Sequence, residues 1–204
     1  MTERPQTSLL EWAVAGVPLH AETVSGDLHV VAPFDGGVLI GAIDGLGHGP
    51  EAAEAARAAV AVLEAHPAES LLRLVERCHD ALRKTRGAVI TLASFHGRND
   101  EMTWMGVGNV EGMLVRADPT KAIEAAPLRG GIVGLRLPVT REDSVSVSPG
   151  DVLILATDGI RGGFTSRLDR SASAAYLAES ILSEHRKSSD DATVVVARYL
   201  GSAP

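Results

Sequence analysis

Four segments of this chain place aspartate among small residues at the end of an apolar run. Several carboxylates brought together repel one another and raise one another's pKa unless cations neutralise them. Carboxylate and carbonyl oxygens are the ligands that hard cations such as Mg²⁺ and Mn²⁺ prefer. The sequence therefore predicts a site for such cations, provided that the fold brings the aspartates together. The segments are Ser25-Gly26-Asp27, Asp44-Gly45-Leu46-Gly47-His48-Gly49, Thr157-Asp158-Gly159 and Asp190-Asp191-Ala192-Thr193.

The apolar runs beside these aspartates predict buried strands, because short apolar runs bounded by turn residues are typical of them. The carboxylates should then lie where strands enter or leave loops, and functional side chains concentrate in such loops. A single Asp-Gly pair is ordinarily a turn, so the prediction depends on the four segments together. The runs are Val38–Ile43 before Asp44, Val152–Ala156 before Asp158, and Val194–Val196 after the fourth segment.

The composition is that of a globular chain with an aliphatic core. The 204 residues are 45% hydrophobic and only 3% aromatic, which argues against disorder. A formal charge of −7 argues against a nucleic-acid surface, whose affinity depends on Lys and Arg. The single cysteine, Cys78, excludes an internal disulfide and fits a reducing compartment. Its helical spacing with Leu71, Val75 and Leu82 is that of a core residue.

No segment indicates export or a membrane partner. The start, Met1-Thr2-Glu3-Arg4-Pro5, lacks the apolar stretch of a signal peptide. No apolar run approaches the roughly 20 residues needed to span a bilayer. We therefore expect a soluble, cytoplasmic protein. No repeat, low-complexity tract or linker is visible, so residues 1–204 are expected to form a single domain.

The hydrophobic periodicity predicts an α+β fold. Strands come first, followed by two helices, a long β-rich stretch, a third helix and a final strand. Helices grouped in sequence, with strands that can pair as hairpins, favour an antiparallel fold over a βαβ repeat. A sandwich of two sheets with helices outside accommodates all of them. The main expected strands are 10–17, 28–32, 37–43, 90–96, 102–107 and 193–200, and the expected helices are 50–65, 67–86 and 173–187.

The second expected helix would end in a basic cluster. Arg83, Lys84 and Arg86 crowd its last turn, and Gly87 follows as a stop signal. The cluster could bind an acidic partner. The simpler interpretation is a solvated helix end whose cations complement the negative end of the helix dipole.

Taken in order, these segments resemble bacterial serine/threonine phosphatases of the metal-dependent protein phosphatase 2C family, in its SpoIIE-like branch. The resemblance covers about residues 16 to 200 and is strongest to the small stand-alone phosphatases of stressosomes. The motifs are weak singly and specific in combination. Besides the four segments named first, they include Gly106-Val107-Gly108-Asn109-Val110 and Pro149-Gly150-Asp151, the latter leading through 152–156 into Thr157-Asp158-Gly159.

The resemblance implies a four-layer αββα sandwich of two mainly antiparallel β-sheets flanked by helices, with two Mn²⁺ or Mg²⁺ ions between the sheets. Catalytic Asp44 would bridge the ions, and the Gly45 carbonyl would help to hold one of them. Asp158 and Asp190 would hold the other. Asp27 would serve the first ion directly or through water. Paired cations lower the pKa of a bridging water, so hydroxide would attack phosphorus in line, without a covalent enzyme intermediate.

Three features depart from eukaryotic members of that family. Those enzymes carry a phosphate-gripping arginine before the first acidic segment, where this chain has Ala21-Glu22-Thr23-Val24. The family histidine is displaced to His48, which could be the general acid or could hydrogen-bond the entry to the helix that starts at Pro50. The stretch between Val115 and Val145 is too short for a large flap domain, so a third metal held by one is not expected.

Three further positions could support the site. Asn109 could do so or could simply end a β segment in a turn. In Asp190-Asp191, one carboxylate can face the metal while the other braces the loop, which leaves Asp191 ambiguous. Gly131 and Gly134 belong to Gly130-Gly131-Ile132-Val133-Gly134, which lacks the Lys and following helix of a P-loop. We expect this segment to be a mobile substrate loop near the site.

The expected function is that of a Mn²⁺- or Mg²⁺-dependent phosphoserine/phosphothreonine protein phosphatase. The resemblance implies that its partners and substrates are phosphorylated STAS-domain proteins of the stressosome, RsbR- and RsbS-like, whose dephosphorylation resets stress signalling. It also suggests a monomer. Alternatives are a phosphatase of an anti-sigma-factor antagonist, as for RsbU- or SpoIIE-like enzymes, a pseudophosphatase that binds without turnover, and a small-molecule phosphatase.

Overall fold

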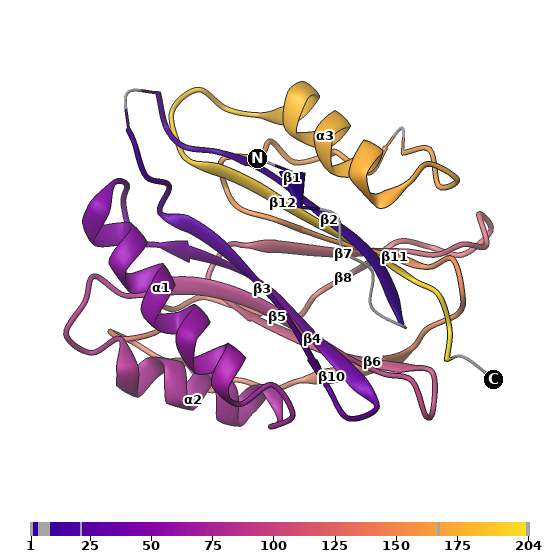
Figure 1. The fold of residues 1–204 in the computed structure, drawn as a ribbon, viewed down its shortest axis with the longest axis horizontal. Helices are drawn as coiled ribbons and strands as arrows, with labels where there is room; N and C mark the ends of the chain where they lie inside the picture. Colours follow the sequence, from indigo (N-terminus) through magenta and orange to yellow (C-terminus); the bar gives the residue numbers. More distant parts are fainter. Residues whose placement is uncertain (1, 4–8, 21, 167, 203–204) are drawn as a thin grey trace.

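Two β-sheets lie face to face in the computed structural model, with helices on the outer side of each (Figure 1). The structure describes residues 2–3, 9–20, 22–166 and 168–202. Of the positions discussed above, Met1, Arg4, Pro5 and Ala21 lie outside the described residues. Among the described residues, no helix is both long and apolar enough to cross a membrane.

The first sheet has six strands in the order β1-β2-β12-β11-β7-β8. Its central strands β11 and β12 are buried almost throughout, because the second sheet covers one face and a helix covers the other. The strands are β1 (Thr2–Glu3), β2 (Leu10–Val17), β7 (Glu111–Val115), β8 (Glu124–Ala125), β11 (Val152–Ala156) and β12 (Ala192–Tyr199).

The second sheet also has six strands, five of them in the order β10-β6-β5-β4-β3, with β9 pairing in parallel with β6. All of its other pairs are antiparallel. The strands are β3 (Asp27–Phe34), β4 (Gly37–Gly45), β5 (Ala88–His96), β6 (Glu101–Val107), β9 (Leu128–Arg129) and β10 (Asp143–Ser146).

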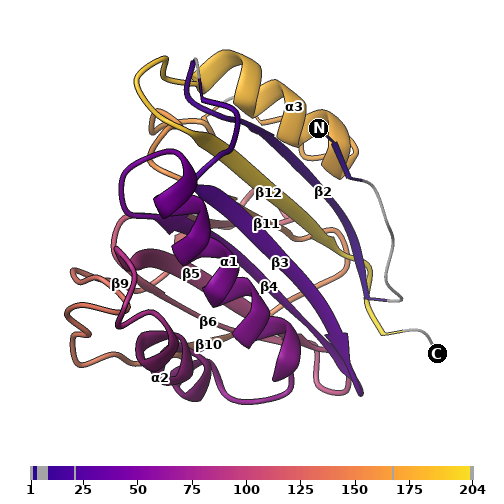
Figure 2. The same cartoon turned by 60° about the vertical axis from the view of Figure 1, so that its left-hand side comes forward.

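Three helices complete the layers: α1 (Pro50–Ala65), α2 (Leu71–Ala81) and α3 (Ala174–His185). Helices α1 and α2 cover the second sheet, whereas α3 covers the first (Figure 2). The face that α1 turns to β3 and β4 is built largely from buried alanines, and these small side chains allow the helix to approach the sheet closely.

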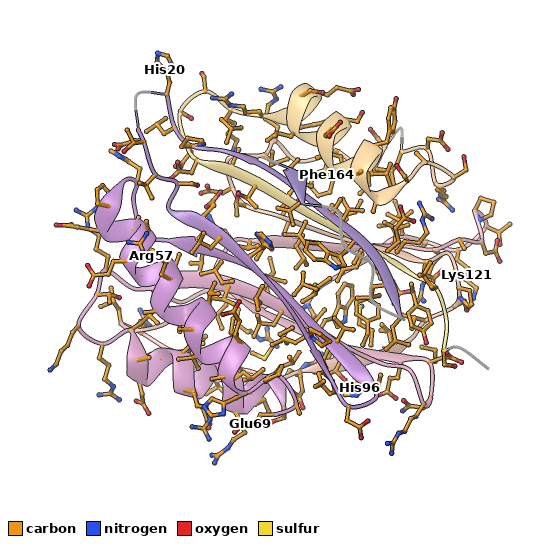
Figure 3. The ribbon with its side chains drawn as sticks, viewed as in Figure 1. His20, Arg57, Glu69, His96, Lys121 and Phe164 are labelled. Atoms are coloured by element: carbon orange, nitrogen blue, oxygen red, sulfur yellow. The ribbon has the colours of Figure 1, made fainter. Side chains whose placement is uncertain are left out.

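The hydrophobic core is divided among three interfaces. Side chains such as Trp12, Phe95 and Leu153 belong to the cluster between the sheets. Figure 3 shows side chains filling this space. A second cluster joins α1 and α2 to their sheet, and a third joins α3 to the other. The four-layer αββα sandwich predicted above is therefore confirmed. Cys78 is buried in the second cluster, as expected, and burial raises the pKa of its thiol to about 12.

The prediction for the second helix was wrong at both ends. The chain from Pro67 remains a turn until Ser70, in extended conformation, begins α2. The helix ends at Ala81, and the Thr85 hydroxyl then donates to the Leu82 carbonyl at 2.9 Å. The expected basic end therefore lies beyond the helix, in a turn that is closed by local hydrogen bonds of Thr85 and that packs at Leu82 against Gly134.

Candidate active site

Five aspartates meet at one end of the sandwich. Asp27 opens β3 and is the register partner of Asp44 in β4. Asp158 lies just beyond β11, while Asp190 and Asp191 immediately precede β12. In an antiparallel pair, the start of one strand lies beside the end of its neighbour. Both strand pairs therefore deliver their carboxylates to the same end, where His20 of the β2–β3 loop also lies (Figure 3).

The carboxylates of this cluster are electrostatically unfavourable to one another. Burial raises the pKa of Asp27 to about 7, an effect opposed by a hydrogen bond from Thr157 and reinforced by the other aspartates. Burial, followed by repulsion from Asp27 and its neighbours, raises the pKa of Asp44 to about 8. Burial and then Asp158 also raise the pKa of Asp190. The cluster thus holds protons near neutral pH unless a cation compensates its charge.

The donor set fits a hard divalent cation. The groups offered are carboxylates and the Gly45 carbonyl, which are oxygen ligands. In the part of the chain that the structure describes, no Lys, Arg or His side chain forms an ion pair with Asp27, Asp44 or Asp158. Within the same residues, no group of three or more His, Cys, Asp or Glu side chains is arranged so that it could already hold a metal ion.

Thr157 fixes Asp27, one of the two buried carboxylates of the cluster. Its hydroxyl donates to Asp27 Oδ2 at 2.7 Å and accepts the Thr193 N–H at 2.9 Å. Thr157 belongs to the first sheet's side of the site and Asp27 to the second. The hydroxyl therefore sets the spacing of the two sheets at the cluster. Sequence reasoning treated Thr157 only as part of a motif and missed this role.

Both carboxylate oxygens of Asp191 accept hydrogen bonds from backbone N–H groups. Its Oδ1 accepts the Leu19 N–H and its Oδ2 accepts the Gly26 N–H, both at 2.7 Å. The Gly26 carbonyl in turn accepts the Gly45 N–H at 3.1 Å. Asp191 therefore braces the loop that precedes Asp27, while Asp190 Oδ1 accepts the Asp191 N–H at 2.9 Å; a ligand role for Asp190 stays a prediction.

Close backbone approach explains the glycines beside two of the aspartates. A Cβ at Gly45 would lie 2.0 Å from the Ala52 carbonyl oxygen, and one at Gly159 would lie 1.8 Å from that of Asp191. Neither contact is possible for a side chain. Helix α1 therefore lies directly against the end of β4, which carries Asp44, and the loops of Asp158 and Asp191 touch through their backbones.

Asp158 is supported by residues from two other loops. The Asn109 side-chain amide donates to Asp158 Oδ2 at 2.9 Å, from the turn where the chain crosses from β6 in one sheet to β7 in the other. The Lys187 ammonium donates to the Asp158 carbonyl, and the Lys187 N–H donates to the Gly159 carbonyl at 2.7 Å. Lys187 was not anticipated from the sequence, because nothing in its neighbours indicates a site.

His48 lies on the rim, with its side chain 56% exposed. Its Nδ1 is 2.8 Å from Oε1 of Glu22, which lies in the stretch where eukaryotic members carry an arginine. His48 is close enough to Asp190 to lower its pKa slightly. Gly49, the N-cap of α1, makes no side-chain capping bond of its own. His48 Nδ1 is held by Glu22, and this is the only hydrogen bond shown for the His48 side chain among the described residues.

The Gly130–Gly134 segment lies one strand away from the cluster. Val133 pairs with Ala88 through two hydrogen bonds of 3.0 and 2.8 Å, and Ala88 pairs on its other side with Gly45. A Cβ at Gly131 would meet Pro138 at 2.6 Å, and Gly134 has a φ of +98° that favours glycine. The expected nearness to the site agrees with this placement, whereas the expected mobility stays a prediction.

Comparison with known proteins places the chain in a family. The family model described as Stage II sporulation protein E (SpoIIE) matches residues 35–200. The chain belongs to the SpoIIE family. It is similar to phosphoserine phosphatase RsbX of Bacillus subtilis (strain 168), with 22% identity over 178 residues, covering 87% of this chain and 88% of that protein.

Solved structures agree with this assignment. A chain from a study of the bacterial stressosome, described as a modular system adapted to control secondary messenger signaling, is 30% identical, with a TM-score of 0.85. The match covers 93% of this chain and 99% of that one. The structure of RsbX in complex with magnesium is 21% identical in sequence, with a TM-score of 0.86. The match covers 98% of this chain and 100% of that one. This SpoIIE-family chain is a serine/threonine protein phosphatase of the 2C type.

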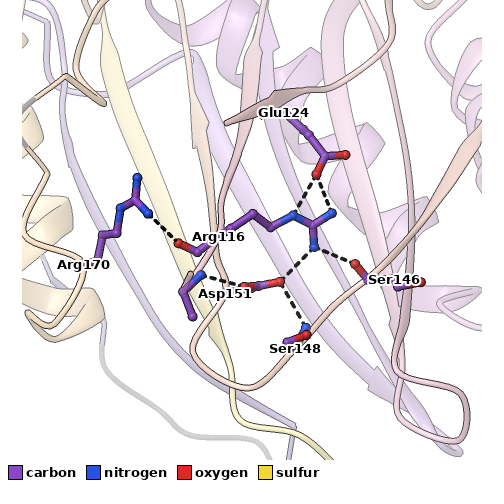
Figure 4. Close-up of polar contacts among 7 residues, drawn as sticks. Arg116, Glu124, Ser146, Ser148, Asp151 and Arg170 are labelled. Carbon is purple, nitrogen blue, oxygen red and sulfur yellow. Dashed lines mark hydrogen bonds and ion pairs between the residues drawn. The ribbon is translucent and has the colours of Figure 1, made fainter. Parts of the chain in front are cut away.

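A second charged cluster surrounds the Pro-Gly-Asp aspartate of the SpoIIE-family block, at the other end of β11 (Figure 4). Asp151 is only 3% exposed. Its Oδ1 accepts the Ala117 N–H at 2.7 Å, and its Oδ2 accepts the Ser148 N–H at 3.0 Å and Arg116 Nη1 at 2.9 Å. Arg116 also pairs with Glu124. This aspartate of the family motif therefore anchors turns and takes no part in the carboxylate cluster.

Proposed function

We propose that this SpoIIE-family phosphatase removes phosphate from phosphoserine and phosphothreonine in STAS-domain proteins of a stressosome, of the RsbR and RsbS kind, and thereby resets stress signalling. One observation carries the proposal: Asp27 and Asp44 are strand partners facing the loops of Asp158 and Asp190, with pKa values raised to about 7 and 8. The likeness to RsbX and to a chain from a stressosome study supports the substrate class. The protein would act as a single phosphatase domain and a monomer.

Two Mn²⁺ or Mg²⁺ ions would complete the site. Asp27, Asp44 and the Gly45 carbonyl are suited to hold one ion, while Asp44, Asp158 and Asp190 are suited to hold the other. The magnesium bound to RsbX supports a divalent ion. Such ions neutralise the carboxylates, activate water for direct attack and stabilise charge on the transferring phosphoryl group.

The protein's own residues would position these groups and supply a proton. Thr157 fixes Asp27, and Asn109 fixes Asp158. Asp191 fixes the loop before Asp27. Because Nδ1 of His48 is directed to Glu22, its Nε2 would be the atom that gives a proton to the departing serine or threonine oxygen. A leaving alkoxide needs such a proton.

The test is phosphate release from a phosphorylated STAS-domain protein with Mn²⁺ and then with chelator. We expect release that chelator abolishes and that the Asp44→Asn variant lacks. A phosphorylated anti-sigma-factor antagonist and a small aryl phosphate are the comparison substrates. Preference for either one would replace the STAS-domain assignment. Binding of Mn²⁺ and of the STAS-domain protein, without release from any substrate, would make the chain a pseudophosphatase.

A further inference from the structure

A guanidinium can bind a phosphate dianion beside metal ions, because it offers two parallel N–H donors. Eukaryotic relatives carry such an arginine before the first acidic segment, where this chain has Glu22, whose Oε1 lies 2.8 Å from His48 Nδ1. A phosphate-binding guanidinium in this chain would therefore come from another element. Three cationic side chains, Lys187, Arg161 and Arg86, lie on loops that adjoin the aspartates.

Two of these cations are engaged in holding the backbone. The Lys187 ammonium donates to the Asp158 carbonyl. The Arg161 guanidinium donates to the carbonyls of Glu184 and Arg186 at 2.8 and 2.9 Å, at the C-terminal end of α3. Releasing either cation to a ligand would leave these carbonyls without their partner and loosen the loop that carries Asp158.

Arg86 is held differently. The Leu46 N–H donates to the Gly87 carbonyl at 3.0 Å, which fixes the segment before β5 against the loop that follows Asp44. The Nη1 atom of Arg86 lies 2.8 Å from where a Cβ of Gly47 would be, so the guanidinium lies on that loop. Arg86 therefore reaches the rim of the site on the side of His48.

The only ion pair shown for Arg86 among the described residues is exchangeable. Its Nη2 contacts Glu51 in the first turn of α1, and the two side chains are 49% and 67% exposed. Exposed pairs of this type contribute little to stability. A phosphate dianion can accept two parallel N–H donors from a guanidinium, which a single exposed carboxylate oxygen does not match.

We propose that Arg86 leaves Glu51 and binds the phosphate of the substrate, so that it replaces the arginine missing from the segment before Asp27. This inference rests on the proposed phosphatase function, because it assigns a substrate-binding residue to the same site. It also gives Glu51 a defined role: the carboxylate competes with phosphate for the guanidinium in the free enzyme.

Binding of inorganic phosphate to the Mn²⁺-loaded protein tests the proposal without turnover. By calorimetry, we expect Arg86→Gln to raise the dissociation constant for phosphate about tenfold or more, the value for a lost charged hydrogen-bonding group. Arg86→Lys should lie between this variant and the wild type. The affinity for Mn²⁺, titrated separately, should stay within about twofold, because Arg86 is not among the oxygen ligands.

Two control variants separate a specific contact from a general charge effect. Arg83→Gln removes an exposed arginine that pairs with Asp80, and it should leave phosphate affinity unchanged. Glu51→Gln should tighten phosphate binding by freeing Arg86, whereas Glu54→Gln, one charge further along α1, should not. Equal effects of Arg86→Gln and Arg83→Gln would overturn the inference.

Steady-state kinetics distinguish failure of the inference from failure of the proposed function. If STAS-domain phosphoproteins are substrates, Arg86→Gln should raise KM about tenfold. Unchanged phosphate affinity and KM in this variant would overturn the role of Arg86 while leaving the phosphatase assignment intact. Loss of phosphate binding in Arg86→Gln, with no release by the wild type from any phosphoprotein, would support Arg86 and reject the proposed function.

Discussion

The two ends of strand β11 carry aspartates in opposite electrostatic situations. At one end, Asp151 accepts two backbone N–H groups and pairs with the Arg116 guanidinium. At the other end, Asp158 has the Asn109 amide and a set of like charges around it. Lys121, labelled in Figure 3, lies toward the Asp151 end, far from His20 at the other end.

The difference shows that the two ends of β11 serve different purposes: the aspartate at one end stabilises the fold, and the aspartate at the other end belongs to the candidate active site. A buried charge that is fully paired and hydrogen-bonded fixes turns, and losing one partner is costly. A cluster of carboxylates that lacks cationic partners costs stability in the free protein and is retained where a ligand compensates it. The family motif joins both kinds of aspartate within eight residues, from Asp151 to Asp158.

The largest effect is expected from Asp44→Asn, which removes charge at nearly constant shape. Phosphate release with Mn²⁺ should fall at least about 10³-fold, because metal ligation supplies several kcal/mol of transition-state stabilisation. In chelator at pH 8, the variant should unfold at the same temperature as the wild type or higher, since a repulsive buried carboxylate is gone. Near-normal turnover would refute the bridging role of Asp44.

The matched change at the other end is Asp151→Ala. It leaves the Arg116 charge partly unpaired and two backbone N–H groups without an acceptor, so unfolding in urea should show a loss of about 3 kcal/mol. The kcat of the folded fraction, measured at low temperature, should stay within about twofold of the wild type, because Asp151 touches no reacting group. A large fall in kcat at unchanged stability would erase the distinction between the two ends.

His48→Ala should have a smaller effect on the carboxylate end. If His48 is the general acid, kcat should fall about 10²-fold, the lower limit for such groups. The melting temperature should change little, because the side chain is largely exposed and its ion pair is with the partly exposed Glu22. The deficit should shrink with a substrate whose leaving group needs no proton, such as a nitrophenyl phosphate. An equal deficit with both substrates would argue for a positioning role.

The smallest effect expected is a pH dependence of the metal-free protein. The folded pKa values of Asp27 and Asp44, about 7 and 8, lie above their ordinary value of 3.8. Between these limits the native state binds more protons than the unfolded state, so stability falls as pH rises. Melting temperatures in chelator should decline from pH 5 to pH 8.5 and then level off.

Two variants and added metal check the source of this pH dependence. Asp44→Asn should flatten the decline, whereas Asp151→Ala should lower the melting temperatures without flattening it. Saturating Mn²⁺ should reverse the trend, because the ions bind the deprotonated carboxylates. A pH-independent melting temperature in chelator would show that the cluster is not a repulsive one.

Local patterns in the sequence determined the elements and the candidate ligands. The ranges of β2 and α1 agree with their predicted limits of 10–17 and 50–65, because side-chain periodicity and the proline at the first turn depend on neighbours within a few residues. The aspartates could be singled out for the same reason, since their four segments combine aspartate with glycine, alanine, serine or threonine near a strand end.

Only the tertiary structure decided how these groups are used. Strand register pairs Asp27 with Asp44, 17 positions away. The hydrogen bond from Thr157 to Asp27 joins residues 130 positions apart, and the one from the Leu19 N–H to Asp191 joins residues 172 positions apart. The early end of α2, which leaves Arg86 on the site's rim, likewise depends on contacts with distant loops. Local propensity contains no information about such pairs, because strand pairing and sheet packing place them together only after the chain has folded.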